Sequence, residues 1–198
     1  MQLVIASTNW HKIREFREIL KSLPGWDILS LQDFPNFKLQ PSNGKSFEEN
    51  ASLKAVTAAR ALEQWVLADD SGIIVPALRG APGILSRYYA GEEASEAENR
   101  KKLLDEMRDR TGLDRAAYLE CCIAIASPKG LQKVVTGCCE GEIVEEERGR
   151  HGCGYDPIFR KHDYDKTFAE LDESVKVRIS DRRKAFEKLA IYLETIQR

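Results

Sequence analysis

Two adjacent carboxylates offer the clearest chemistry in this sequence. Asp69 and Asp70 follow a short apolar run, residues 66–68, and precede Ser71 and Gly72. Two carboxylates directly after a buried strand are costly to bury without partners, whereas at a cleft they could hold a hard divalent cation or activate water. A turn would also accommodate Asp-Asp-Ser-Gly, so a purely structural role is the alternative.

A second polar segment, STNWHK at residues 7–12, could bind an anion. It follows an apolar run and opens a stretch with helical spacing, where unpaired backbone N–H groups and the helix dipole favour negative charge. Two hydroxyls, one amide and one Lys add donors. The segment contains no glycine, so it is neither a Walker A loop nor a dinucleotide fingerprint. Its alternative role is to cap the helix through Ser7, Thr8 or Asn9.

Polar residues also stand at the start of an Ala-rich segment that ends near Leu62. Ser46 and Glu49 have the spacing of a capping box, which predicts that a helix begins here. Completing that box is the simpler role of Glu49. Asn50 has no such routine role in a first helical turn, so it is the better candidate for binding a ligand.

Two later segments carry groups suited to a nucleotide. In GCGYDPIF, residues 152–159, the glycines permit close backbone approach, and Tyr155 offers an aromatic face for a nucleobase. Asp156 could accept a hydrogen bond from the base or the ribose. Residues 176–188 hold six basic residues against two acids. Much of this surplus is expected to be a solvated helix face, and a single aromatic, Phe186, does not make the interleaved pattern of an RNA-binding module.

The elements that must position these groups alternate along the chain. Strands are expected at residues 3–7, 66–68 and 72–75, helices after residue 12 and at 46–62 and 94–110, a hairpin at 116–127 and 131–144, and a last helix capped by Ser180. Strands interleaved with helices, plus one long hairpin, predict an α/β fold with a mixed sheet in one domain, residues 1–198. Loops after strand ends should then line a ligand cleft.

Composition limits the partners. The 198 residues include 30 Lys and Arg against 32 Asp and Glu, for a net charge of −2, so neither nucleic acid nor an anionic membrane surface is an expected partner. No apolar run approaches the roughly 20 residues that span a bilayer, and the first is too short for a signal peptide, which predicts a cytoplasmic location. The five cysteines lack CxxC spacing, and the adjacent pairs Cys121-Cys122 and Cys138-Cys139 are expected to be reduced strand residues.

Six short motifs occur in a characteristic order. They are STNWHK at 7–12, FEENA at 47–51, ADDSG at 68–72, APG at 81–83, GYDPIF at 154–159 and KTFAEL at 166–171. Together they resemble the inosine triphosphate pyrophosphatase family, also called XTP/dITP diphosphatases, over nearly the whole chain. Each motif alone is weak, but six in order are specific.

The resemblance implies a fold, a reaction and partners. The implied fold is an elongated central mixed sheet flanked by helices, with two lobes around a nucleotide cleft, usually in a homodimer. The implied reaction is hydrolysis of ITP, dITP and XTP to nucleoside monophosphate and pyrophosphate with Mg²⁺, for which Mn²⁺ is a substitute. The role that follows is removal of deaminated purines from the nucleotide pool.

The resemblance also implies roles for individual residues. Asp70 would be the catalytic proton acceptor, and the metal ligands would come from Glu49, Asp69 and Asp70. The residues that would contact the substrate are Ser7, Thr8, Asn9, Trp10, His11, Lys12, Asn50, Ser71, Cys153, Gly154, Tyr155, Asp156, Lys176, Asp181 and Arg182. Arg182 is the expected donor to O6 of a 6-keto purine.

Two positions depart from the family pattern. Asp181 stands where the family usually has His in Ser-His-Arg, and Tyr88 stands where it has Arg after APG. An ionised Asp only accepts hydrogen bonds, so guanine-type bases are expected to be rejected less firmly. Two alternatives follow: a nucleotide-binding sensor that has lost turnover, and a Maf-like nucleotide pyrophosphatase, against which the ADDSG and GYDP motifs argue.

Overall fold

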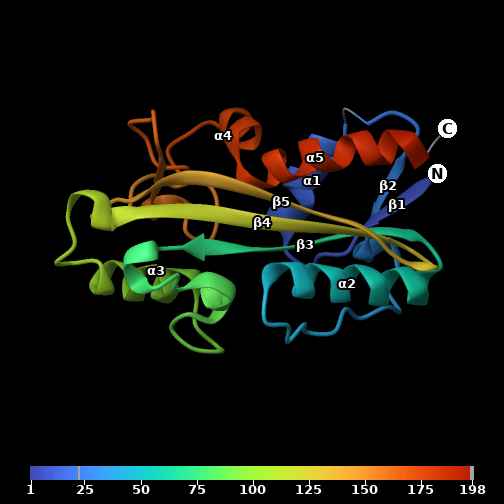
Figure 1. The fold of residues 1–198 in the computed structure, drawn as a ribbon, viewed down its shortest axis with the longest axis horizontal. Coiled ribbons are helices and arrows are strands. Elements are labelled where there is room, and N and C mark those ends of the chain that lie inside the picture. Colours follow the sequence, from blue (N-terminus) through green and yellow to red (C-terminus); the bar gives the residue numbers. More distant parts are fainter. Residues whose placement is uncertain (22, 197–198) are drawn as a thin grey trace. The chain divides into compact units, whose positions relative to one another are not determined.

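Six strands form one mixed sheet in the order β2-β1-β3-β4-β5-β6 in the computed structural model, which describes residues 1–21 and 23–196 (Figure 1). The strands are β1 (Gln2–Ile5), β2 (Asp27–Ser30), β3 (Trp65–Ile74), β4 (Ala116–Ser127), β5 (Gly130–Ile143) and β6 (Phe159–Lys161). The α-helices are α1 (Trp10–Leu20), α2 (Phe47–Leu62), α3 (Glu96–Glu106), α4 (Glu173–Ile179) and α5 (Asp181–Ile196). β1 is parallel to β2 and β3, whereas β5 and β6 are antiparallel. This confirms the predicted α/β fold with a mixed sheet flanked by helices.

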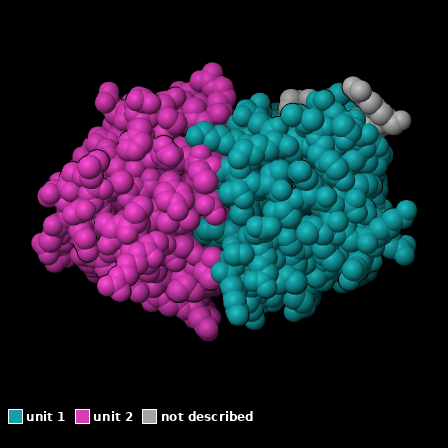
Figure 2. Space-filling view, viewed as in Figure 1, with its two compact units in different colours: residues 1–70, 121–137, 182–198 teal, residues 71–120, 138–181 magenta. Residues whose placement is uncertain are grey.

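The chain forms two compact units, coloured separately in Figure 2. Unit 1 comprises residues 1–70, 121–137 and 182–198, and unit 2 comprises residues 71–120 and 138–181. Each of the strands β3, β4 and β5 contributes residues to both units.

Unit 1 is built on the parallel pairing of β1 with β2 and β3. All of Leu3, Val4 and Ile5 are completely buried, so this strand is apolar on both sides, as is usual in parallel sheets. α1 begins because the Asn9 side chain caps it, and it turns Phe16 and Ile19 into the core. α2 begins after Ser46, whose hydroxyl accepts from the Glu49 N–H at 3.1 Å.

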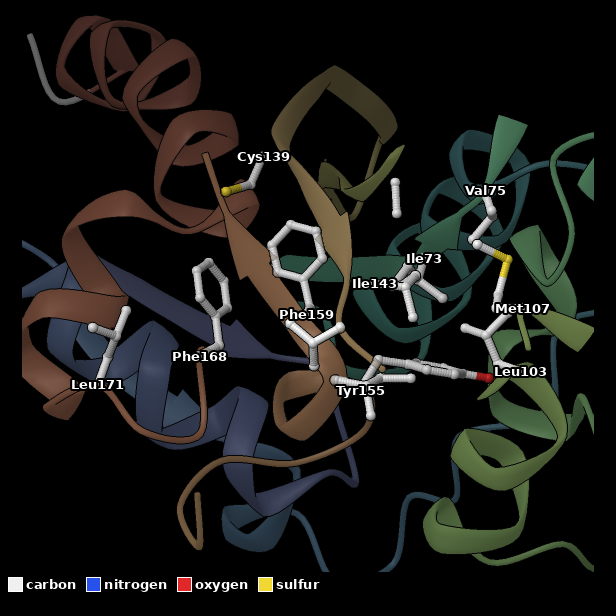
Figure 3. Close-up of a cluster of buried hydrophobic side chains, with 13 residues drawn as sticks. Ile73, Val75, Leu103, Met107, Cys139, Ile143, Tyr155, Phe159, Phe168 and Leu171 are labelled. Atoms are coloured by element: carbon white, nitrogen blue, oxygen red, sulfur yellow. The ribbon is translucent and has the colours of Figure 1, made fainter. Parts of the chain in front are cut away.

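Unit 2 has its own apolar cluster, drawn in Figure 3. Phe159 and Phe168 meet edge to face with their ring centroids 5.1 Å apart. The Tyr155 ring belongs to the same cluster, together with Ile143 and Leu103. Since these residues come from α3, β5 and the segments around β6, the cluster ties the later half of the chain to α3.

Several elements agree with the sequence prediction and one does not. The long hairpin and the helix after Ser46 are confirmed, and α5 begins directly after Ser180. The prediction of two short strands separated by a turn at Asp69–Ser71 is wrong, because β3 runs unbroken from Trp65 to Ile74. The partners described below satisfy both carboxylates, so the strand need not break to expose them. The strand β2 and the helix α4 were not predicted.

The structure also bears on the cysteines and on the question of a membrane-spanning helix. The five cysteines are free thiols, and the two adjacent pairs lie in β4 and β5, as predicted for strand residues. Within residues 1–21 and 23–196, no helix has the length and apolar character needed to cross a membrane.

Candidate functional site

The parallel register of β1 and β3 brings two of the predicted segments together. Ile5 pairs with Leu67, and the Ala6 N–H donates to the Leu67 carbonyl at 2.8 Å. β1 ends at Ile5, whereas β3 continues in the same direction past Leu67 to Ile74. The loop after β1 therefore lies beside Asp69 and Asp70, which follow Leu67 by two and three residues.

Asp69 is the centre of a buried ionic cluster in unit 1. Its Oδ2 accepts from Lys12 Nζ at 2.7 Å and from Arg182 Nη2 at 3.1 Å, and the Cys121 thiol lies 3.8 Å away. Its side chain is only 1% exposed. Burial alone would raise the pKa of Asp69, but the charges of Lys12, Arg182 and Lys54 hold it well below its usual range.

A second buried carboxylate, Glu15 on α1, completes this cluster. Arg182 Nη1 donates to Glu15, and the Arg182 guanidinium also lies 5.3 Å from the centre of the Phe16 ring. Sequence reasoning missed Glu15. The signal was present, since a Glu three residues after Lys12 and four before Ile19 falls on the face of the helix that enters the core. The guanidinium expected to contact a base is held by protein carboxylates here.

Asp70 has different partners, because consecutive strand residues point to opposite faces of a sheet. Its Oδ2 accepts from Asn50 Nδ2 at 2.9 Å, and its Oδ1 from Lys54 Nζ at 2.8 Å. Lys54 also donates to the Asp69 carbonyl at 2.5 Å. Both partners come from α2, so this helix orients the Asp70 carboxylate. The carboxylate stays partly open, with its side chain 21% exposed.

The predicted metal ligands are not assembled at one point. Asp69 and Asp70 face opposite sides of β3, and Glu49 accepts instead from the Lys45 N–H at 2.6 Å. Among the described residues, no group of three or more His, Cys, Asp or Glu side chains is placed to hold a metal ion. The oxygens of Asp70 and Glu49 are nevertheless the hard donors that Mg²⁺ prefers, and Mg²⁺ is often held by one or two carboxylates plus substrate phosphates.

The start of α1 combines capping with exposed donors. Asn9 Oδ1 accepts from the N–H groups of His11 at 2.9 Å and Lys12 at 3.2 Å, and Ser7 Oγ accepts from the Asn9 N–H. The capping role is therefore present. Trp10 is 53% exposed. Binding of an anion by residues 7–12, Thr8 and His11 included, stays a prediction.

In unit 2 the predicted substrate segment, residues 153–156, is held by hydrogen bonds to its own Asp156 side chain. Asp156 is buried, and its Oδ2 accepts from Lys176 Nζ at 2.5 Å and from the Cys153 N–H at 2.8 Å. A Cβ atom at Gly152 would lie 2.2 Å from the same oxygen, so this glycine, at a φ of +82°, is required by the close approach. Lys176 and the segment 153–156, each predicted to contact the substrate, are thus in contact with one another.

The structure corrects the prediction for the Tyr155 ring. The ring packs in the apolar cluster of unit 2, and its hydroxyl donates to the Ser86 carbonyl at 2.8 Å. Burial raises the pKa of the Tyr155 hydroxyl well above its usual value. Such a ring offers little free face for stacking. Its aromatic character serves packing, which spacing in the sequence could not separate from base recognition.

The two remaining predicted residues lie close to the boundaries of the units. Ser71 follows the two carboxylates on β3 and is half-buried. Asp181 is the first residue of α5 and is buried, whereas Arg182 beside it belongs to unit 1.

Comparison with known proteins bears on this arrangement. The model of the Ham1 family matches residues 3–192. The chain is 56% identical to a protein of Protochlamydia amoebophila named dITP/XTP pyrophosphatase, over 100% of both chains. It is 50% identical to a protein of the same name from Chlamydia abortus, over 99% of this chain and 96% of the other.

A solved structure agrees with the sequence matches. The Staphylococcus aureus Ham1 protein superposes with a TM-score of 0.85 at 42% identity, covering 98% of this chain and 99% of the other. A family match over residues 3–192, relatives of near-equal length and a shared fold lead to one conclusion: the chain belongs to the Ham1 family.

Proposed function

We propose that this protein hydrolyses deaminated purine nucleoside triphosphates, namely dITP, XTP and ITP, to the nucleoside monophosphate and pyrophosphate. The observation that carries the proposal is the partly open Asp70 carboxylate, oriented by Asn50 and Lys54 in a chain that matches the Ham1 family along its length. The relatives named dITP/XTP pyrophosphatase support the choice of substrate. The family match argues against the Maf-like alternative.

Asp70 is the proposed proton acceptor. Attack of water on the α-phosphorus requires a group that orients the water and takes its proton, while the bond from the α-phosphorus to the bridging oxygen of the leaving pyrophosphate breaks. Two donors hold this carboxylate in one orientation, and its exposed part leaves room for a water molecule. Such a fixed base reduces the reorganisation needed during the reaction.

Lys12 is the proposed contact to the triphosphate. Its ammonium is fixed by Asp69 at 2.7 Å, yet its side chain remains 21% exposed. A Lys ammonium has three donors, so one can remain on Asp69 while others bind phosphate oxygens. Asp69 is therefore proposed to hold Lys12 in place rather than to ligate a metal.

Asp70 and Glu49 are the residues proposed to hold Mg²⁺, with Mn²⁺ as a substitute. Bound there, the ion would neutralise charge on the polyphosphate and so favour departure of pyrophosphate. Asp69 fits this role poorly, because Lys12 and Arg182 already compensate its charge. On the resemblance alone, we further propose a homodimer acting on the nucleotide pool of the cytoplasm.

The proposal is tested by following both products. Pyrophosphate and monophosphate release from dITP, XTP, ITP, GTP and ATP would be measured with Mg²⁺, giving kcat/KM for each. We expect equimolar products, preference for the first three, and a loss of about 10² or more in kcat for Asp70→Asn. Asp105→Asn, which alters an exposed ion pair on α3, is the matched control and should keep full activity.

Two outcomes would overturn parts of the proposal. Full turnover by Asp70→Asn would show that Asp70 is not the proton acceptor. No turnover of any triphosphate, restored by Asp181→His, would favour the sensor, since a donor at this position would then be what the scaffold lacks.

A further inference from the structure

One glycine of the predicted substrate segment is held through its backbone by two side chains of α3. The Gly154 N–H donates to Glu96 Oε2 at 2.7 Å, and its carbonyl accepts from Arg100 Nη1 at 2.9 Å. Glu96 and Arg100 are four residues apart and therefore share one face of the helix. Both backbone polar groups of Gly154 are thus satisfied by one helix that carries none of the motifs.

Arg100 holds the other end of the same loop as well. Its Nε and Nη2 donate to the two carboxylate oxygens of Glu147, at 2.9 and 3.0 Å. This is a bidentate pair, the strongest geometry available to Arg and a carboxylate. The Arg100 side chain is 13% exposed and that of Glu147 is 41% exposed, so the guanidinium is the more deeply buried half of the pair. One guanidinium therefore joins residues 147 and 154.

The backbone of the loop between these points is held partly by its own residues. Gly152 and Gly154 both have positive φ, +82° and +58°, a conformation that glycine adopts readily. Asp156 Oδ2 accepts from the Cys153 N–H, but apart from its chain neighbours no atom lies within 4 Å of a Cβ built at Gly154, so the space on that side of the residue is open. At Gly154 the hydrogen bonds to the two α3 side chains therefore add restraint that packing on this side does not provide.

We propose, on the basis of the function above, that Glu96 and Arg100 are positioning residues that hold segment 153–156 in the conformation that binds the nucleotide. They act through Gly154 and Glu147 and do not themselves need to touch substrate. A residue that pre-orders a binding segment contributes equally to the ground state and the transition state. Its loss should raise KM and leave kcat nearly unchanged.

The test compares Arg100→Ala and Arg100→Lys with the wild type. Steady-state kinetics on dITP should show KM raised about 10-fold for Arg100→Ala, with kcat within twofold. Arg100→Lys keeps the positive charge but cannot make the bidentate pair with Glu147, so its KM should lie between those of the wild type and Arg100→Ala. Glu96→Gln, which keeps an acceptor for the Gly154 N–H, should change KM least.

A second readout does not depend on turnover. Amide hydrogen exchange in peptides covering residues 147–156 should be about 10-fold faster in Arg100→Ala, with exchange in β1 and α1 unchanged. Arg108→Ala is the matched control, because it removes an exposed Arg–carboxylate pair between the turn after α3 and Asp105 of that helix. It should alter neither KM nor exchange.

The outcomes separate this inference from the proposed function. An active wild type with Arg100→Ala unchanged in KM and in exchange would overturn the positioning role alone. Loss of kcat at constant KM would also overturn it, because the effect would then lie on chemistry. A wild type that hydrolysed none of the triphosphates would overturn the proposed function, and this inference with it.

Discussion

Asp69 and Asp70 are neighbours in sequence but occupy opposite kinds of environment. The Asp69 side chain is 1% exposed and is surrounded by Lys12, Arg182 and Cys121, whereas Asp70 is 21% exposed and meets only Asn50 and Lys54 among the contacts described. Both residues lie in the unbroken strand β3, where consecutive side chains point to opposite faces of the sheet. This alternation is enough to place the two carboxylates in different environments.

This difference assigns a structural role to one carboxylate and a chemical role to the other, which the motif ADDSG alone does not do. A buried carboxylate compensated by two cations cannot readily take a metal or a proton, but it can hold those cations in place. A carboxylate that is partly open, with its orientation fixed by two donors, can accept a proton or bind Mg²⁺. We therefore assign Lys12 positioning to Asp69 and chemistry to Asp70.

The largest expected effect comes from removing the buried carboxylate. Asp69→Ala leaves Lys12 and Arg182 without their shared acceptor, a carboxylate that is 1% exposed. We expect the free energy of unfolding to fall by about 3–5 kcal/mol, measured by urea denaturation at pH 7. Asp70→Ala, on the open face, should cost about 1 kcal/mol or less by the same measurement.

A double variant sharpens this test. If the cost of Asp69→Ala is the uncompensated charge it leaves behind, adding Lys12→Met should recover part of the lost stability, whereas Arg182 is kept because it also pairs with the buried Glu15. Equal losses for Asp69→Ala and Asp70→Ala, with no recovery in the double variant, would contradict the proposed contrast between the two carboxylates.

Most residues of this site could be identified from the sequence, but the different roles of Asp69 and Asp70 could not. Helical spacing, capping residues and the hairpin turn are local signals, so α1, α2 and the β4–β5 hairpin could be predicted. The parallel pairing of β1 with β3 depends on residues about 60 apart, and no local signal reports it. For that reason the Lys12–Asp69 pair was not foreseen, although both residues were singled out.

The burial of individual side chains could not be predicted from the sequence either. The Tyr155 ring and the Asp156 carboxylate have the right chemistry to bind a base, yet packing and Lys176 already engage them. Glu15 looks like an ordinary helical charge until Arg182, 167 residues away, is placed beside it. Partners that distant emerge only from the tertiary structure.

The pH dependence of stability gives a smaller and more selective test of Asp69. Because its pKa is held below the usual value, near 4 in an unfolded chain, Asp69 stabilises the fold above that pH. This contribution is lost as the pH falls below about 4, where the unfolded chain takes up the proton first. The difference in unfolding free energy between wild type and Asp69→Asn should therefore narrow below pH 4.

The measurement is a set of urea curves from pH 7 down to pH 3 for both proteins. Only the difference is informative, because bonds from Ser95 also lower the pKa of Glu98, which contributes to acid unfolding of both. A difference that stayed constant over this range would mean that the Asp69 charge does not stabilise the folded state.

The smallest expected effect tests the open face. Lys54→Met removes one of the two donors to Asp70 and keeps most of the side-chain stem, so we expect a stability loss of about 1 kcal/mol. Because Asn50 alone then orients the base, kcat for dITP should fall about 10-fold. Lys45→Met, at an exposed position just before α2, is the control and should change neither the free energy of unfolding nor kcat. A loss of stability as large as that of Asp69→Ala would show that the Asp70 face is also structural, and the separation of roles along β3 would fail.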